Sequence, residues 1–212
     1  MRFKLQLVTG PSVEPVSLSE AKLHLRVDVS DDDTLITSLI KSARLWCETQ
    51  CGRAFVSQQL RMSLDCFPAG DGDFYDIETA ILLARGCRIL LPRPNLISVD
   101  SIAYTDSDGT PRTLSVSDYQ VDLADEPGAV EPAVGGYWPA TQYGKVNAVQ
   151  ITYTAGYGPA ASDVDERAKI AIKLLVAHWY ENREAVLTGT VSKEIELGLE
   201  RVLAQLWHGH NF

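Results

Sequence analysis

The sequence is poor in basic residues and in long apolar runs, and each shortage excludes a class of protein. The 19 lysines and arginines are outnumbered by 28 aspartates and glutamates, which gives a formal net charge of −9. No basic surplus is therefore present to neutralise the phosphates of a bound nucleic acid. No apolar run approaches the roughly 20 residues of a membrane-spanning helix, and the first seven residues lack the apolar core of a signal peptide. We expect an acidic, water-soluble protein that is made in the cytoplasm and does not contact a membrane.

Cysteine is also scarce, and its spacing argues against a zinc or redox centre. Cys47 and Cys51 are four residues apart, as on one face of a helix, whereas zinc ribbons and redox motifs use C-x-x-C. Cys66 and Cys87 have no neighbouring cysteine with which to form a ligand pair. The sequence therefore predicts buried thiols and no metal site.

Catalytic and metal-binding motifs are missing as well. The acidic run Asp31–Asp33 is explained by the start of a helix, where carboxylates face the positive end of the dipole. The run Asp106–Gly109 lacks the third acidic position of a calcium loop and is typical of a hairpin turn. No nucleophile elbow, phosphate loop or zinc-protease motif occurs. The four histidines, at positions 24, 178, 208 and 210, do not combine with a nucleophile. We expect no enzymatic activity, no cofactor and no metal.

What the chain does contain is ordinary globular composition, with 45% hydrophobic and 22% charged residues. The first part, residues 1–54, is predicted to be helical after an extended start. Ser17 and Glu20 form a capping box ahead of a short helix. A longer helix, about 33–51, follows with apolar residues in amphipathic rhythm, and Gly52 stands where a helix-ending glycine belongs.

The middle part, residues 55–158, is predicted to be a β-rich module, since it holds seven of the ten prolines. Its short β-type runs are residues 88–91, 96–99, 101–104, 119–122 and 149–153. The segment 123–147 is too long for a simple connection. Its aromatic residues, Tyr137, Trp138 and Tyr143, form either a packed cluster or a contact surface.

The last part, residues 159–212, returns to helix. Asp163 and Glu166 indicate a second capping box. The helix that follows, about 164–183, is apolar on nearly every face, so we expect it to be buried all round, either by its own domain or by neighbouring subunits. A final helix, about 192–207, carries an apolar stripe formed by Ile195, Leu199, Val202, Leu203 and Leu206 and followed by Trp207. The predicted fold class is α+β: a small helical bundle from both chain ends with an inserted antiparallel β-rich module.

The helix boundaries resemble those of tailed-bacteriophage head–tail connector (adaptor) proteins, in a longer type with an inserted β module. The resemblance rests on the segments Val16–Val27, Asp31–Ile36, Cys51–Arg53, Ile151–Tyr157 and His178–Glu184. It implies a structural virion protein of the neck. About a dozen copies would form a ring below the portal that joins head to tail and extends the DNA channel, with two different faces in contact around the ring.

The resemblance further implies three partners: further copies of the chain, the portal protein, and a downstream neck or tail protein. DNA would pass through without sequence-specific binding. Within the β-rich module, residues 61–158 carry a net charge of −7, from 6 basic and 13 acidic residues. The acidity of the chain therefore favours easy passage of DNA only where this module lines the channel.

Two helices, about 33–51 and 164–183, are expected to build the subunit core and the ring contacts. The last helix is the candidate docking element for the portal or a neighbouring subunit. Candidate contact residues are Ile195, Leu199, Val202, Leu203, Leu206, Trp207, Trp179 and Arg183. Packing of the stripe onto its own bundle, and capping of a helix end by Arg183, are the alternatives. For the whole protein the alternatives are another neck or tail-completion protein, or a non-viral ligand-binding module that uses Tyr137, Trp138 and Tyr143.

Overall fold

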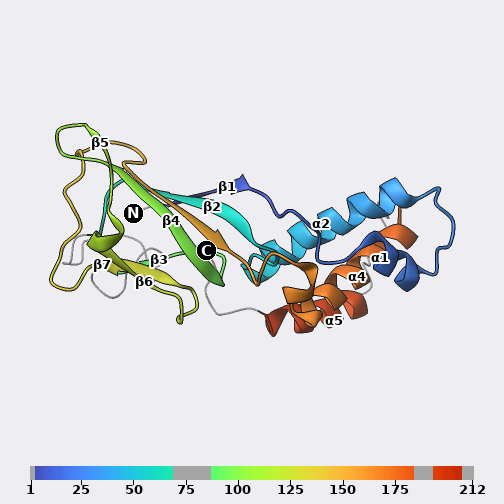
Figure 1. The fold of residues 1–212 in the computed structure, drawn as a ribbon. Helices are drawn as coiled ribbons and strands as arrows, with labels where there is room; N and C mark the ends of the chain where they lie inside the picture. The colour runs from blue at the N-terminus through green and yellow to red at the C-terminus, as the bar shows by residue number, and fades with distance from the viewer. Residues whose placement is uncertain (1–2, 69–86, 184–192, 207–212) are drawn as a thin grey trace. The chain divides into compact units, whose positions relative to one another are not determined.

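The fold was analysed in a computed structural model that describes residues 3–68, 87–183 and 193–206. It combines helices with antiparallel sheets, and the predicted α+β class is confirmed (Figure 1). The chain divides into two compact units. The β unit consists of Met1–Gly10 and Gln58–Gly156, and the helical unit consists of Pro11–Ser57 and Tyr157–Asn211.

The helical unit is built from segments at both ends of the chain. Its elements are α1 (Leu18–Leu25), α2 (Asp33–Cys51), the 3₁₀ turn η2 (Ala161–Asp163), α4 (Glu166–Glu181) and α5 (Lys193–Ala204). The predicted capping box is present, because the Ser17 hydroxyl accepts from the Glu20 N–H and the Glu20 carboxylate accepts from the Ser17 N–H. Gly52 ends α2 at φ 67°, a left-handed conformation that glycine adopts without a Cβ penalty.

The start of α4 differs from the prediction. Its N-cap is Asp165, whose carboxylate accepts a hydrogen bond of 2.8 Å from the N–H of Arg167. Asp163 instead ends the η2 turn and accepts from the N–H of Ala160 at 2.9 Å. Both aspartates satisfy free N–H groups at the start of a turn, but the 3₁₀ turn moves the beginning of α4 two residues along the chain.

The core of the helical unit lies between α1, α2, α4 and α5. Its fully buried members include Ile36, Cys47, Phe55, Ile172 and Val176. The helical unit alone does not bury α4 on every side, because Ile170 and Leu174 are exposed. These two residues are one helical turn apart and therefore share a face of α4. Burial of that face by a neighbouring subunit, the other possibility, stays a prediction.

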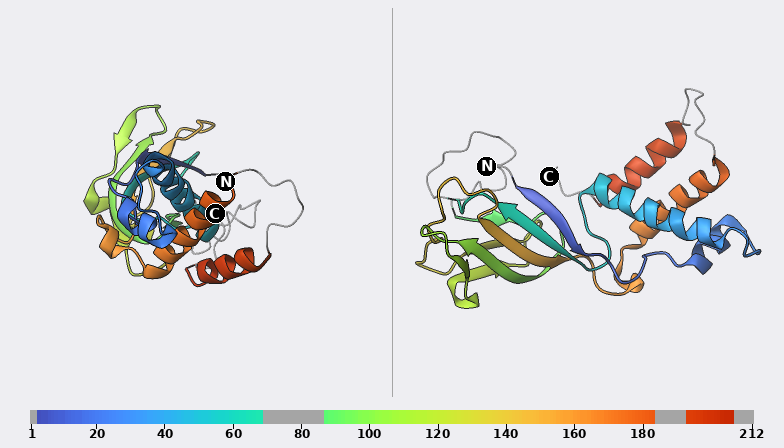
Figure 2. Two further views of the ribbon diagram at one scale, coloured as in Figure 1. Left: turned by 90° about the vertical axis from the view of Figure 1, so that its right-hand side faces the viewer. Right: turned by 90° about the horizontal axis from the view of Figure 1, so that it is seen from above.

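The β unit contains two sheets. The five-stranded sheet has the order β1-β2-β8-β4-β5 and the three-stranded sheet the order β3-β7-β6, and every named pair is antiparallel. The strands are β1 (Lys4–Thr9), β2 (Gln58–Leu64), β3 (Ile89–Leu90), β4 (Leu96–Thr105), β5 (Pro111–Thr113), β6 (Tyr119–Asp122), β7 (Ala129–Pro132) and β8 (Val149–Ala155). The 3₁₀ turn η1 (Val116–Asp118) leads into β6. Figure 2 shows both units from two further sides.

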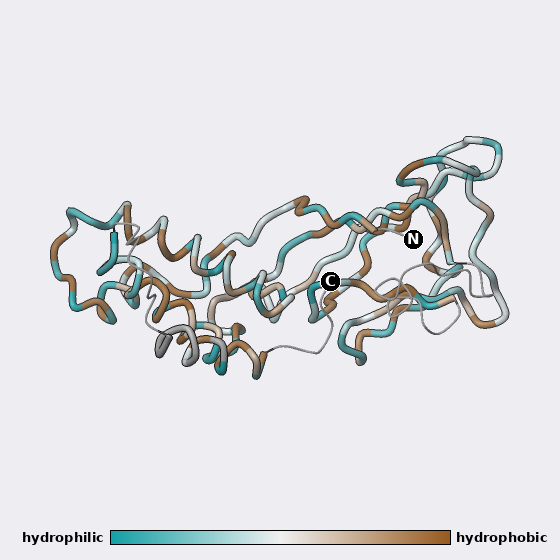
Figure 3. Tube along the Cα trace, turned by 180° about the vertical axis from the view of Figure 1, so that it is seen from behind, coloured by the Kyte–Doolittle hydropathy of each residue, from teal (hydrophilic) through white to brown (hydrophobic). Residues whose placement is uncertain are grey.

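Alternation of side chains determines which face of the main sheet is buried. Every second residue of β2 and β8 is buried, among them Met62, Ile151 and Tyr153. Figure 3 shows the corresponding alternation of polar and apolar residues along the chain. The buried phenol of Tyr153 donates to the carbonyl of Pro92 at 2.7 Å, which ties the loop after β3 to the sheet.

The predicted strand runs are found with two differences. The runs 96–99 and 101–104 form one strand, β4, whose pairing with β8 is irregular at two points. Strand β7 lies inside the segment 123–147 that was predicted to be a loop. The turn at Asp106–Gly109 does connect two paired strands, β4 and β5, and the Asp106 carboxylate accepts from the N–H groups of Asp108 and Thr110.

Candidate assembly surfaces

A polar network joins the start of α2 to the end of α4. The Asp32 carboxylate accepts from the Tyr180 hydroxyl at 2.6 Å and pairs with the Arg183 guanidinium at 2.6 Å. That guanidinium also lies over the Tyr180 ring, 4.6 Å from its centroid. The hydrogen bonds from Tyr180 and then Arg183 lower the pKa of Asp32. Asp32 belongs to the segment Asp31–Ile36, and Tyr180 and Arg183 belong to the segment His178–Glu184. These two segments carry the resemblance, and they are in contact although Asp32 and Tyr180 are 148 residues apart in sequence.

Arg53 fastens the end of α5 to the helical unit. Its side chain is buried, its Nε donates to the carbonyl of Leu206 at 2.5 Å, and its guanidinium lies 5.8 Å from the centre of the Tyr157 ring. The carbonyl follows the last turn of α5, where backbone acceptors lack helical partners. The arginine of the Cys51–Arg53 segment therefore holds the end of the last helix.

A second buried arginine ties the chain before α1 to α2. Arg44 pairs with Glu14 at 2.7 Å and with Glu48 at 2.8 Å. Burial opposes the charged form of Arg44, but the hydrogen bond to Glu14 and the nearby carboxylates raise its pKa above the ordinary value. Glu48 also accepts from the N–H of Phe55 at 2.9 Å, so the same network shapes the turn after α2.

The contact residues predicted on the last helix include buried residues and a partly buried one. Leu199, Leu203 and Leu206 are buried in the core of the helical unit, and Val202 packs against that core partly buried. This is the alternative arrangement, in which the stripe packs onto its own bundle. The side chain of Ile195 and the whole of Trp207 lie outside the described residues.

The two other predicted contact residues lie at the end of α4. Trp179 is partly buried against the core of the helical unit. Arg183 is half-exposed and shows the alternative role of capping, since its Nε donates to the Tyr180 carbonyl at 3.3 Å, while a terminal nitrogen pairs with Asp32 of the same chain at 2.6 Å. Contacts of Trp179 and Arg183 with a partner stay predictions.

The helical unit also presents apolar side chains that the sequence did not single out. Leu23 on α1 is 81% exposed and belongs to a surface hollow whose other apolar lining residues are Leu18 and Val27. Ile170 and Leu174 form the exposed face of α4. Contacts of moderate size between subunits combine such apolar centres with a polar rim.

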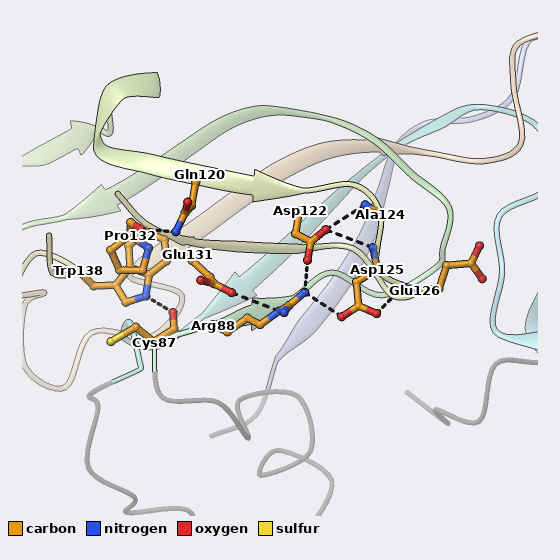
Figure 4. Close-up of polar contacts among 10 residues, drawn as sticks. All are labelled: Cys87, Arg88, Gln120, Asp122, Ala124, Asp125, Glu126, Glu131, Pro132 and Trp138. Carbon is orange, nitrogen blue, oxygen red and sulfur yellow. Dashed lines mark hydrogen bonds and ion pairs between the residues drawn. The ribbon is translucent and has the colours of Figure 1, made fainter. Parts of the chain in front are cut away.

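In the β unit, the guanidinium of Arg88 is surrounded by three carboxylates (Figure 4). One of its terminal nitrogens pairs with Asp122 at 2.7 Å and with Asp125 at 2.9 Å, while its Nε lies 3.5 Å from Glu131. Backbone N–H bonds from Ala124 and Asp125, together with Arg88, lower the pKa of Asp122. Because these residues come from three segments, Arg88 joins β3 to the ends of β6 and β7.

The three aromatic residues of the segment 123–147 do not form one platform. The Trp138 ring stacks on Phe67 with a centroid separation of 4.8 Å, and its Nε1 donates to the Cys87 carbonyl at 2.6 Å. Tyr137 and Tyr143 project into solvent almost completely. One aromatic residue is thus packed and two are exposed.

No chemical centre is evident in the described part of the chain. Within residues 3–68, 87–183 and 193–206, no group of three or more His, Cys, Asp or Glu side chains is placed to hold a metal ion. None of the helices there is both long and apolar enough to cross a membrane. Cys47 and Cys51 are buried as predicted, and burial raises the pKa of Cys47 to about 12, which keeps its thiol protonated. Cys66, however, is exposed and Cys87 is half-buried.

Comparison with known proteins gives two results. Residues 15–72 match the model of the family described as "Phage gp6-like head-tail connector protein". Among curated protein sequences none matches the chain.

Solved structures of gene transfer agent (GTA) particles contain chains with the same fold. A chain from the neck of an empty GTA particle, computed with C6 symmetry, is 20% identical, with a TM-score of 0.73 over 96% of this chain and 95% of that one. A chain from the virion of a native gene transfer agent particle is 21% identical, with a TM-score of 0.72 over 96% and 94%. A chain from the neck of a native particle, computed with C12 symmetry, is 20% identical, with a TM-score of 0.68 over 96% and 94%. The first helical segment therefore carries the sequence pattern of head–tail connector proteins, the chain as a whole has the fold of these neck chains, and the resemblance inferred from the sequence is confirmed.

Proposed function

We propose that the protein is a structural component of a tailed-phage-like virion. About a dozen copies form a ring in the neck, below the portal, and this ring joins head to tail and extends the DNA channel. The observation that carries the proposal is the likeness over nearly the whole chain to neck chains of particles computed with C6 and C12 symmetry. The connector pattern in residues 15–72 supports it independently.

The proposed partners are neighbouring copies, the portal and a downstream neck or tail protein. A ring requires each subunit to present two different surfaces that fit one another. Exposed apolar side chains on α1 and α4, namely Leu23, Ile170 and Leu174, are available for such contacts. DNA passes through the ring without being bound in a sequence-specific way, which agrees with a net charge of −9.

We retain the end of α4 and the helix α5 as the proposed docking region for the portal or an adjacent subunit. Because Leu199, Leu203 and Leu206 pack inwards, docking through them would require α5 to leave its own unit, which the Arg53–Leu206 bond opposes. Docking through the outer face of α5, together with Arg183 and Trp179, requires no such release.

The experiment that tests the proposal is a mass measurement of the purified full chain, alone and with the portal of the same particle. Native mass spectrometry and negative-stain microscopy are expected to show closed rings that form cooperatively with concentration or on the portal. A protein that stays monomeric at all concentrations and does not bind the portal would refute the proposal. Arg201→Glu, at an exposed position on α5, tests the docking region: it is expected to weaken portal binding while it leaves the folded subunit intact.

A further inference from the structure

The two sheets of the β unit end at four edge strands, β1 and β5 in one sheet and β3 and β6 in the other. The two longest of these are β1 and β6, and within the described ranges β1 pairs only with β2 and β6 only with β7. Among the described residues, no other strand pairs with the outer N–H and C=O groups of β1 or β6. Natural proteins usually cover or block such edges, since they otherwise pair with other chains.

Both edges also expose apolar side chains. On β1, Leu7 is 50% exposed and Val8 is 41% exposed. On and just after β6, Val121 and Leu123 are exposed as well. Figure 1 draws β1 at the upper edge of the five-stranded sheet and β6 in the lower, three-stranded sheet, so the two edges belong to different sheets of the β unit. A strand that exposes apolar residues along an open edge is stabilised when a second strand covers it.

The charges around the two edges have opposite sign. The first thirteen residues contain two basic residues, one of them Lys4, and no acidic residue. Around β6, Arg88 is the single basic group among five acidic ones, at positions 118, 122, 125, 126 and 131. Pairing of β1 with β1 or of β6 with β6 would bring like charges together, whereas pairing of β1 with β6 brings opposite charges together.

The two remaining edge strands are poor partners for β1. Strand β3 has only two residues, Ile89–Leu90, and strand β5 has only three, Pro111–Thr113. In β5, hydrogen bonding and charge both oppose such pairing. Its proline has no N–H to donate, and Arg112 adds a positive charge opposite the basic β1. Hydrogen-bonding capacity and charge therefore both favour β6 as the partner strand of β1.

From these observations we propose that β1 of one subunit pairs with β6 of the next copy of the chain. The contact is head-to-tail, because it uses a different edge on each subunit, and repeated contacts of this kind close a ring. The inference rests on the proposed function and names one of its interfaces: the three-stranded sheet of one subunit is continued by the five-stranded sheet of its neighbour. Each pairing buries Leu7 and Val8 against Val121 and Leu123.

Disulfide cross-linking tests this pairing directly. In a chain whose Cys66 and Cys87 are replaced by serine, single cysteines are placed at positions 6, 7 and 8 of β1 and at 120, 121 and 123 on and after β6. Variants of the two groups are mixed, assembled (on the portal if required) and oxidised. We expect cross-links between the groups with a two-residue alternation typical of paired strands, and none within a group. A chain with one cysteine of each group is expected to give a ladder of covalent oligomers.

Gln150→Cys on β8, combined with Val121→Cys, is the matched control, because Gln150 faces Ser63 of β2 on one side and Ala103 of β4 on the other and cannot pair with a third strand. If rings form by mass measurement and the cross-links do not exceed this control, the β1–β6 contact is wrong while the ring proposal stands. If no ring forms in the parent chain under any condition, the proposed function itself fails.

A second test uses charge instead of cysteine. The double substitution Leu7→Glu and Val8→Glu changes exposed side chains, so the subunit is expected to fold normally. It is expected to raise the concentration needed for ring assembly by about tenfold or more, since it removes apolar contacts and places negative charge opposite the acidic β6. Val29→Glu combined with Val146→Glu, at two exposed positions outside the proposed contacts, is the control for added charge. Equal assembly of the double variant and the parent chain would overturn the inference.

Discussion

Replacement of Arg53 by methionine is the sharpest test of how the last helix is held. Methionine keeps an apolar stem of similar length, so the main loss is the guanidinium. That group is buried, donates to the Leu206 carbonyl at 2.5 Å and lies over the Tyr157 ring. Leu206 itself is only 2% exposed, so water cannot readily take the place of the lost donor.

The size of the effect follows from the cost of an unpaired buried acceptor. Such a group costs about 1–3 kcal/mol, and each 1.4 kcal/mol corresponds to a factor of ten in an equilibrium constant. If α5 opens locally before it exchanges, its amide hydrogens are expected to exchange about 5- to 150-fold faster in the variant. The core strands of the β unit are expected to exchange at unchanged rates.

The assay is hydrogen–deuterium exchange with mass spectrometry on peptides from α5 and from β8. Arg201→Met is the control, because Arg201 is exposed on the same helix. The reasoning is refuted if Arg53→Met folds normally and the exchange of α5 changes by less than about twofold. The same result would leave the Cys51–Arg53 segment without a structural explanation.

Three further perturbations probe the other contacts. Asp32→Asn removes the carboxylate that accepts from Tyr180 and pairs with Arg183. These contacts lower the pKa of Asp32. The stability that they contribute is therefore present above the usual aspartate pKa and is lost as the pH falls through the lowered pKa. Denaturation should therefore separate Asp32→Asn from the parent chain at pH 7 and bring them together in strong acid, and a constant gap would contradict this. Leu203→Ala should lower the free energy of unfolding by about 2–5 kcal/mol, far more than Val202→Ala does, whereas equal small losses would mean that the stripe is not a core. Arg88→Gln should lower the free energy of unfolding in urea by about 1 kcal/mol and speed amide exchange in β6 and β7. Arg112→Gln, on an exposed ion pair, is the control.

The helices were predictable because local chemistry specifies them. The longer N-terminal helix was predicted over about 33–51 and is found at Asp33–Cys51, since a regular apolar rhythm and a terminal glycine mark it. The start of α4 was placed too early, because an intervening 3₁₀ turn uses Asp163 in the same way as a helix cap would. Capping chemistry does not distinguish a 3₁₀ turn from an α-helix start by itself.

The strands were predicted less completely, and the reasons are physical. Strand β1 carries no burial pattern, because nearly all its residues are exposed at a sheet edge. Its partner β2 does alternate, but with Gln58 and Met62 at buried positions, and the polar residue obscures the period. Strand β7 is only four residues long and includes Pro132, so it could not be separated from the surrounding loop.

The contacts that join distant segments could not be predicted from one sequence. Asp32 was explained by its position at a helix start, yet its side chain does not cap α2 and binds Tyr180 and Arg183 instead. Likewise, nothing local indicates that Arg53 reaches Leu206, 153 residues later. In both pairs the sequence identified the residue, and tertiary packing determined its partner.

We propose that this chain forms the ring that joins a portal to a tail, and electron microscopy of the full chain mixed with the portal of the same particle can show that ring. The expected image is a closed ring of copies, coaxial with the portal and open along its axis, with neighbouring subunits in head-to-tail contact. Single copies scattered on the portal, a closed disc without a channel, or no binding would contradict it.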